Sequence, residues 1–223
     1  MPVNISAYQS IQATLVDQGV TLIAVSKTKP KEELMELYTL GHRAFGENYV
    51  QELVDKEVAL PKDIQWHFIG HLQSNKVKYI APFVYMINGV DSEKLLQEIN
   101  KQAIKQNRVI DCLLQVHIAT EETKFGFDAE DIQELIQSGR LAQYANIRIK
   151  GLMGMASFSD DPSLLTKEFM SLKQIFDQAA THLGNPFTIL SMGMSSDYAL
   201  AIRLGSNMVR IGSLLFGARN YSK

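Results

Sequence analysis

Hydrophobic and polar positions along this chain follow two alternating periods. Short, nearly continuous apolar runs, such as Leu22-Ile23-Ala24-Val25, are typical of buried strands. Between them lie longer stretches with apolar residues three or four apart, which are typical of amphipathic helices. The pattern predicts a helix over residues 4–17 and then eight strand–helix units. The predicted strands are 21–26, 43–45, 64–70, 83–87, 109–118, 147–153, 188–191 and 208–211.

Regular alternation of buried strands and amphipathic helices indicates a parallel sheet. The predicted helices after the first are 31–40, 49–59, 74–80, 92–106, 129–138, 163–182 and 197–204, before a tail over 214–223. An open, doubly wound sheet is the main alternative, but no Gly-x-Gly-x-x-Gly follows a predicted strand. Eight units in 223 residues favour a closed barrel. We therefore predict an α/β fold: one (β/α)8 TIM barrel domain over 1–223, with an extra N-terminal helix.

Composition and charge narrow the class of protein. The formal net charge of −2 gives no global attraction to nucleic acid or to an anionic membrane. No apolar stretch is long enough to span a bilayer, and the first residues do not have the pattern of a secretory signal. The single cysteine, Cys112, excludes an internal disulfide and a cysteine-rich metal site, and its apolar surroundings predict a buried thiol. We expect a soluble, cytoplasmic protein.

Polar residues with chemical potential stand where the predicted strands end, which is where barrels gather their active sites. These residues are Lys27, Asn48, His67, Asn88, His117, Ser191 and Arg210. A lysine at the end of a buried strand is a candidate Schiff-base former, although it can also simply extend its amine to solvent. Lys29 has the same strand parity as Lys27, so the pattern does not choose between them.

The loops after the seventh and eighth predicted strands carry glycines and serines. In one loop Gly193 permits close backbone approach, and Ser195 or Ser196 is expected to cap the next helix. In the other, Gly212 and Ser213 form a second turn. Each feature alone fits an ordinary cap or tight turn. Together, at the two strands after which barrels often bind phosphate, they predict a phosphate site.

A phosphate site and a strand-end lysine on one rim suggest pyridoxal 5′-phosphate (PLP). Arg210 is then the candidate partner of the pyridine nitrogen, the alternative being a salt bridge at the rim. An arginine is always charged and disfavours protonation of that nitrogen, which weakens carbanion chemistry.

Six ordered segments resemble the pyridoxal phosphate homeostasis protein family, which is itself similar to the N-terminal barrel domain of alanine racemase. The segments are Ala-Val-Ser-Lys-Thr-Lys-Pro (24–30), Phe-Gly-Glu-Asn-Tyr-Val-Gln-Glu (45–52), Trp-His-Phe-Ile-Gly (66–70), Leu-Gln-Ser-Asn-Lys (72–76), Ser-Met-Gly-Met-Ser-Ser-Asp (191–197) and Val-Arg-Ile-Gly-Ser-Leu-Leu-Phe-Gly-Ala-Arg (209–219). The resemblance runs nearly end to end and implies a fold-type III PLP-binding barrel.

The resemblance also implies roles for single residues. Lys27 rather than Lys29 would carry PLP covalently as an aldimine, with Arg210 facing the ring nitrogen and Asn48 close to the cofactor. Lys124 matches a second lysine near the cofactor, proposed to help in its transfer. The residues that would hold the phosphate are Ser195, Ser196, Gly212 and Ser213. One departure is visible, because the fifth strand usually ends in an asparagine where this chain has His117.

Histidines and a methionine near the rim are further candidates for the site. His67 either contacts the cofactor or its neighbours, or is structural. Met192, like other methionines of the late loops, is expected to pack under the cofactor. His67 and His71 are four apart but straddle a strand end and a turn, so we predict no metal site.

Two classes of function remain open. An amino-acid racemase needs a base on each face of the cofactor, and alanine racemase takes its second base from an additional β-domain of a partner subunit. This chain ends soon after the eighth predicted strand, so we expect no such domain. We therefore predict a non-catalytic protein of PLP homeostasis, which holds PLP on a lysine and buffers it or supplies it to apo-enzymes. The alternative is a racemase-like enzyme with weak activity. The expected partners are PLP and apo PLP-dependent enzymes, not nucleic acid or membrane, and the expected state is a monomer.

Overall fold

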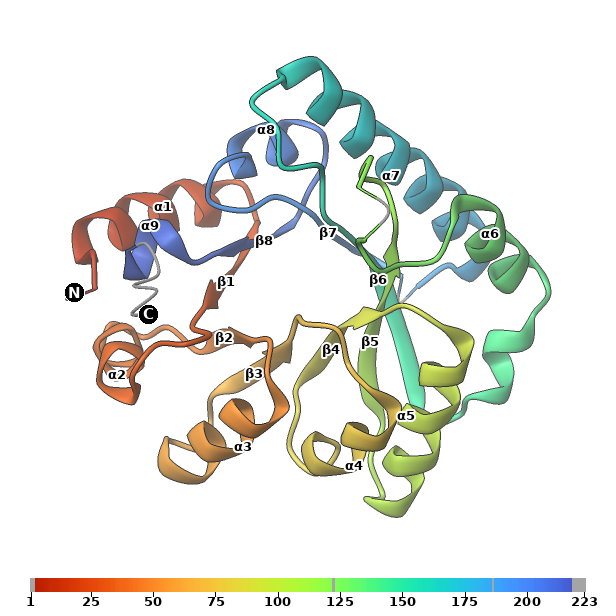
Figure 1. Cartoon of the computed structure of the whole chain (residues 1–223), viewed down its shortest axis with the longest axis horizontal. Helices are drawn as coiled ribbons and strands as arrows, with labels where there is room; N and C mark the ends of the chain where they lie inside the picture. Colours follow the sequence, from red (N-terminus) through yellow and green to blue (C-terminus); the bar gives the residue numbers. More distant parts are fainter. Residues whose placement is uncertain (1–2, 122, 186, 218–223) are drawn as a thin grey trace.

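Eight parallel strands close into a barrel in sequence order, β1-β2-β3-β4-β5-β6-β7-β8 (Figure 1). This computed structural model describes residues 3–121, 123–185 and 187–217. Pairing of β1 with β8, from Thr21↔Met208 to Ala24↔Ile211, closes the ring. The strands are β1 (Thr21–Val25), β2 (Ala44–Glu47), β3 (Gln65–Phe68), β4 (Met86–Val90), β5 (Ile110–Val116), β6 (Ile147–Gly154), β7 (Ile189–Ser191) and β8 (Met208–Ile211). The predicted (β/α)8 TIM barrel is confirmed.

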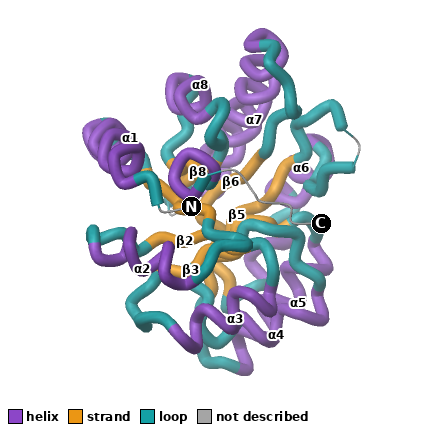
Figure 2. Tube along the Cα trace, turned by 60° about the vertical axis from the view of Figure 1, so that its left-hand side comes forward, coloured by secondary structure: helices purple, strands orange, loops and turns teal. Residues whose placement is uncertain are grey.

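The helices lie outside the ring of strands (Figure 2). They are α1 (Ile5–Asp17), α2 (Lys31–Thr39), α3 (Val50–Ala59), α4 (Val77–Ile80), α5 (Glu93–Lys105), α6 (Ala129–Gln137), α7 (Pro162–Leu183), α8 (Tyr198–Arg203) and α9 (Ser213–Phe216), with short 3-10 turns η1 (Ser74–Lys76) and η2 (Arg140–Gln143). The extra helix α1 begins at Asn4, whose side chain caps it by accepting a hydrogen bond from the Ala7 N–H. Among the described residues, no helix combines the length and apolarity needed to cross a membrane.

Two apolar layers explain why the strands read as continuous hydrophobic runs. The larger layer lies between strands and helices and includes Leu22, Trp66 and Phe68. A smaller inner cluster fills the barrel with Ile23, Ala44, Met86, Leu113, Met153 and Met208. Because each strand is buried on both faces, apolar residues occupy inward and outward positions alike.

Strand β4 and the C-terminal tail differ from the prediction. Strand β4 is shifted by three residues at both ends, since the apolar Val84 still belongs to the turn after α4 and donates its N–H to Ile80 O. Asn88, which was predicted to follow the end of this strand, therefore lies inside it together with Gly89. The tail predicted from residue 214 contains the end of α9, and residues 218–223 lie outside the described part.

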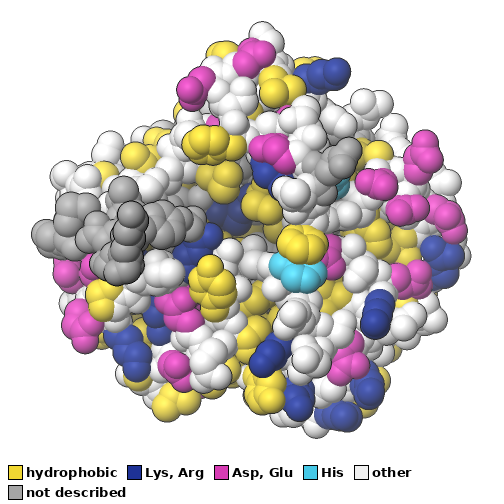
Figure 3. Space-filling model, viewed as in Figure 1, with side chains coloured by type: hydrophobic (Ala, Val, Ile, Leu, Met, Phe, Trp, Pro, Cys, Tyr) yellow, Lys and Arg dark blue, Asp and Glu magenta, His cyan; other side chains and the backbone are white. Residues whose placement is uncertain are grey.

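Cys112 is fully buried in β5, as predicted, and burial raises the pKa of its thiol. On the face seen in Figure 3, acidic and basic side chains are interspersed around the periphery. This mixture agrees with the small net charge of −2.

Candidate functional site

Lys27 lies one residue beyond the last ladder hydrogen bond of β1, in which Ser26 N–H donates to Gly46 O at 3.0 Å. Ile23 on this strand belongs to the inner cluster. Side chains two and four residues further on continue on the same side of a strand, so this alternation brings Lys27 to the mouth of the barrel. Lys29 is committed elsewhere, because its ammonium donates to Phe216 O at 2.5 Å. This bond to a distant carbonyl is a contact of Lys29 that strand parity could not reveal.

Arg210 lies in the barrel mouth, on β8 beside β1. It is paired with Ile23 in the β1–β8 register, and it follows the inward-facing Met208 by two residues. Its guanidinium donates to Ser191 Oγ at 2.7 Å and to Gly154 O at 2.9 Å. Burial lowers the pKa of Arg210 to about 10, and Asp197 opposes this shift. The side chain therefore remains a fixed cation at neutral pH.

The loops after β7 and β8 meet through Ser195, whose Oγ accepts a hydrogen bond from Gly212 N at 3.3 Å. The expected capping of α8 by Ser195 or Ser196 is wrong. Asp197 is the N-cap, and its carboxylate turns back to accept the N–H of Met194 at 2.6 Å. Ser195 is consequently used to join the two turns, and the backbone of the second turn passes close to β1.

Gly212 permits this close passage, because an added Cβ would lie 3.3 Å from both Cβ and O of Val25. Ser196 and Ser213 are exposed beside these turns. The glycine–serine turns thus stand next to each other and next to the strand that precedes Lys27, as a shared phosphate site requires.

Asn48 follows β2 and has a buried side-chain oxygen, Oδ1, with no hydrogen-bond partner among the described residues. Gly70 packs on its backbone so closely that an added Cβ would lie 2.5 Å from Asn48 O. A buried polar atom without a partner is unfavourable and calls for a ligand or solvent. Asn48 therefore suits a position beside a polar cofactor.

His67 is inside the barrel, where its Nδ1 lies 3.2 Å from Asn88 Oδ1. Asn88 Nδ2 in turn lies 3.6 Å from Met208 Sδ. Burial lowers the pKa of His67 to about 4, so the ring is neutral at physiological pH. These contacts give His67 a structural role, and its contact with a cofactor stays a prediction.

Met192 is fully buried, but in the layer between strands and helices. Met153 instead belongs to the inner cluster, and Met155 packs against it. The position of Met192 does not favour direct contact with a group in the barrel mouth, whereas Met153 and Met155 lie on the appropriate side.

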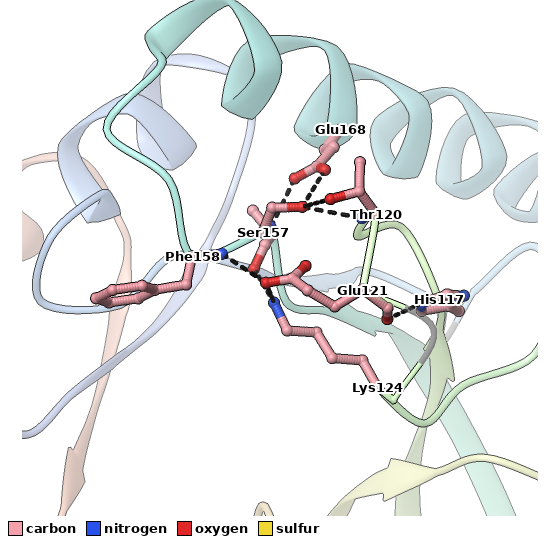
Figure 4. A network of polar contacts seen from close by, with 8 residues as sticks. His117, Thr120, Glu121, Lys124, Ser157, Phe158 and Glu168 are labelled. Atoms are coloured by element: carbon pink, nitrogen blue, oxygen red, sulfur yellow. Dashed lines mark hydrogen bonds and ion pairs between the residues drawn. The ribbon is translucent and has the colours of Figure 1, made fainter.

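Lys124 belongs to a polar network that joins the loop after β5 to the loop after β6 (Figure 4). Its ammonium donates to Ala156 O at 2.7 Å and to Glu121 Oε1 at 3.1 Å. His117 holds the same loop through its Nε2, 2.9 Å from Glu121 O. The unusual histidine at position 117 thus fixes the loop that carries Lys124.

Sequence reasoning missed a second lysine, Lys56 on α3, which is buried behind the Lys27 turn. Its ammonium contacts Glu47, Glu52 and Ser26 O. Two signals in the sequence could have revealed it. Lys56 lies three residues after the buried Leu53, hence on the same helix face, and four residues after Glu52.

The residues around the mouth fit PLP in their chemistry. A fixed cation lies inside the mouth, two adjoining turns offer hydroxyl and backbone N–H groups, and Asn48 Oδ1 is without a partner among the described residues. Within the same part of the chain, no group of His, Cys, Asp or Glu side chains is arranged to hold a metal ion.

Comparisons with known proteins agree with this chemistry. Residues 6–220 match the family model for the alanine racemase N-terminal domain. The chain is 41% identical over 216 residues to the pyridoxal phosphate homeostasis protein of Schizosaccharomyces pombe, covering 96% of this chain and 90% of that protein. It is 40% identical over 201 residues to the protein of the same name from Aquifex aeolicus, covering 90% and 87%.

The fold also agrees closely with that of a solved structure. PipY of Synechococcus elongatus, solved with PLP bound, superposes with a TM-score of 0.83 at 34% identity, covering 92% of this chain and 98% of PipY. Because the similarity in sequence and in fold extends over nearly the whole barrel, the chain belongs to the pyridoxal phosphate homeostasis protein family.

Proposed function

We propose that this protein binds PLP at the barrel mouth, holds it covalently on Lys27, and acts in PLP homeostasis as a carrier rather than as an enzyme. PLP-bound PipY and the homeostasis proteins at about 40% identity support the binding and the homeostatic role. When bound, PLP supplies an aldehyde that a lysine amine can capture and a ring that can withdraw electrons.

The residues of the mouth divide the work as follows. The ε-amine of Lys27 forms a carbon–nitrogen double bond with the aldehyde carbon, and the aldehyde oxygen leaves as water. Ser195, Ser196, Gly212 and Ser213 offer hydrogen bonds to the phosphate. Asn48 offers the cofactor its Oδ1, which accepts from no group in the described part of the chain. We assign Lys124 to the wall of the site and His67 to its structural support.

Arg210 is the observation that carries the choice of carrier over enzyme. The residue is 4% exposed, and its guanidinium is held by hydrogen bonds to Ser191 and Gly154. A group that is already protonated donates to the pyridine nitrogen and gives it no proton, so the ring stays a weak electron sink. Such a ring promotes loss of a substrate proton only weakly unless a well-placed base compensates, which favours storage of the aldehyde over catalysis.

Covalent capture is tested by loading the protein with PLP, reducing with borohydride and mapping the modified peptide. We expect the cofactor on Lys27 in the wild type, none fixed in Lys27→Ala, and normal labelling in Lys29→Ala. Lys29 is the matched control because it is in the same turn but donates to Phe216 O. Labelling that survives in Lys27→Ala would contradict the assignment.

The carrier role is tested by transfer from the loaded protein to a defined apo-enzyme in the presence of a trap for free PLP. Activation of the apo-enzyme despite the trap supports direct hand-over, and activation only without the trap supports buffering. Exchange of the α-proton of alanine or serine in heavy water, at about 1 s⁻¹ or faster, would instead establish the racemase-like alternative.

A further inference from the structure

A buried cluster of charges lies directly behind the turn that carries Lys27. Lys56 is 3% exposed and Glu47 is fully buried. The Lys56 ammonium donates to Ser26 O at 2.8 Å, to Glu47 Oε1 at 2.7 Å and to Glu52 Oε1 at 2.7 Å. These three acceptors use all three protons of the ammonium group. Lys56 is therefore held at one point behind β1.

The cluster forms hydrogen bonds with the residues on both sides of Lys27. Before it, Ser26 is bound twice: its carbonyl accepts from Lys56, and its Oγ donates to Glu47 Oε1 at 2.6 Å. After it, the Thr28 N–H donates to Glu52 Oε1 at 2.6 Å. Lys27 is thus the one residue between two backbone anchors that share a single ammonium group.

Thr28 shows that this turn is held in a conformation the chain does not prefer. Its φ is +63°, in the left-handed region that β-branched residues rarely adopt. Such a conformation persists only where surrounding contacts impose it. The Glu52–Thr28 hydrogen bond, backed by Lys56, is a contact that imposes it here.

Burial of these charges is a poor way to gain stability. Replacing a buried ion pair by apolar side chains of similar volume is often neutral or stabilising. An apolar residue at position 56 would share its helix face with the buried Leu53. What the charged cluster supplies, and an apolar one would not, is the set of hydrogen bonds that fixes Ser26 and Thr28.

We propose that Lys56, with Glu47 and Glu52, is a positioning residue for Lys27: the cluster fixes the turn so that the Lys27 amine meets the aldehyde of PLP. This inference rests on the proposed function. It assigns the three residues no contact with the cofactor, and it predicts that they govern covalent capture more than non-covalent binding.

The test separates these two steps. Covalent capture is followed by mixing apo-protein with PLP, quenching with borohydride at set times and measuring labelled Lys27. Non-covalent binding is measured by calorimetry with pyridoxine 5′-phosphate, which carries the same ring and phosphate but an alcohol where PLP has its aldehyde. The main variant is Lys56→Met combined with Glu47→Gln, which removes both buried charges together.

We expect capture to slow at least about tenfold in the double variant, since small misplacement of a reacting group reduces rates strongly. Affinity for pyridoxine 5′-phosphate should stay within about threefold, which corresponds to less than about 0.7 kcal/mol. The matched control is Lys173→Met, which removes the exposed i,i+4 pair Lys173–Asp177 and should change neither quantity.

A second pair of variants keeps the test decisive if the double variant does not fold. Glu52 is partly exposed, and Glu52→Gln keeps an oxygen for Thr28 N–H while Glu52→Ala removes it. We expect capture by Glu52→Ala to be several-fold slower than by Glu52→Gln, at equal affinity for pyridoxine 5′-phosphate.

Three outcomes would overturn the inference. Capture at the wild-type rate in every cluster variant means that the cluster does not position Lys27. A parallel loss of capture and of pyridoxine 5′-phosphate binding means that it only maintains the structure. Absence of capture by the wild type overturns the proposed function as well, so the two failures are told apart by the unmutated protein.

Discussion

Two lysines of this barrel make similar bonds in different surroundings. Lys56 and Lys124 each donate to a backbone carbonyl of a rim loop and to a carboxylate. The Lys56 side chain is 4% exposed, whereas the Lys124 side chain is 25% exposed. The first is locked between two carboxylates and a strand end, and the second is within reach of water, which can replace its partners.

The carboxylates of the two lysines differ in the same sense. Burial raises the pKa of Glu47, although Lys56 and Ser26 oppose the shift. Hydrogen bonds from the Phe158 N–H, its own N–H and Lys124 hold the pKa of Glu121 down at about 2. The surroundings of Glu47 disfavour its ionised form, whereas those of Glu121 favour it. The comparison teaches that the ion pair on the β1–β2 side of the rim is buried, whereas the one on the β5–β6 side is accessible to solvent.

The largest expected effect is on stability. Lys56→Met leaves Glu47 buried without its cation, and we expect a loss of about 3–5 kcal/mol in the free energy of unfolding. Lys124→Met breaks a partly exposed pair, and we expect a loss of at most about 1 kcal/mol. Urea titration monitored by circular dichroism measures both. Adding Glu47→Gln to Lys56→Met should restore part of the loss, and equal effects of the two single substitutions would contradict the comparison.

The next effect is a pair of opposite pH slopes. Because the pKa of Glu121 is lowered from 4.5 to about 2, its contribution is present above pH 4.5 and is lost as the pH falls towards 2. Because the pKa of Glu47 is raised from 4.5, its contribution is present below pH 4.5 and is lost as the pH rises through the folded-state value.

Unfolding free energies of the wild type, Glu47→Gln and Glu121→Gln between about pH 2 and pH 7 measure these slopes. The advantage of the wild type over Glu121→Gln should shrink towards acid, and its advantage over Glu47→Gln should shrink towards neutral pH. Slopes of the same sign in both variants would show that the two carboxylates do not differ as described.

The smallest expected effect concerns hand-over of the cofactor. Lys124→Ala should keep covalent capture on Lys27 but slow PLP transfer to an apo-enzyme by a few-fold, about 1 kcal/mol or less in barrier height. The rate of apo-enzyme activation by the loaded variant measures it, with Lys173→Met as a surface control. Unchanged transfer would remove Lys124 from the hand-over step and leave it as a loop support.

The strand–helix alternation was sufficient to predict the barrel, because burial on both faces gives each strand an unbroken apolar signature. The hydrophobic pattern predicted the elements wrongly where local sequence preferences and tertiary contacts disagree. Asn88 was predicted to follow the end of the fourth strand, yet it is buried in β4 beside His67. The four-residue helix α9 is too short to show a helical period.

The site could be predicted only where chemistry coincides with strand ends. Lys27, Arg210 and the glycine–serine turns stand at such ends and attract attention. Lys56 escaped because a lysine in mid-helix normally faces solvent, and only the folded chain shows that its face is turned to the barrel. The preference for Lys27 over Lys29 rests on the family resemblance, because the two lysines have the same strand parity.

The hydrogen bond between Lys29 and Phe216 has a consequence for how the protein is made. Lys29 in the β1–α2 turn is bonded to a carbonyl 187 residues further along the chain, and Leu215 O accepts the N–H of Asn4. During synthesis β1 emerges early, but its turn lacks this anchor until Phe216 has left the ribosome. Because β1 also pairs with β8, the barrel mouth beside β1 is complete only once residues 208–211 have been synthesised.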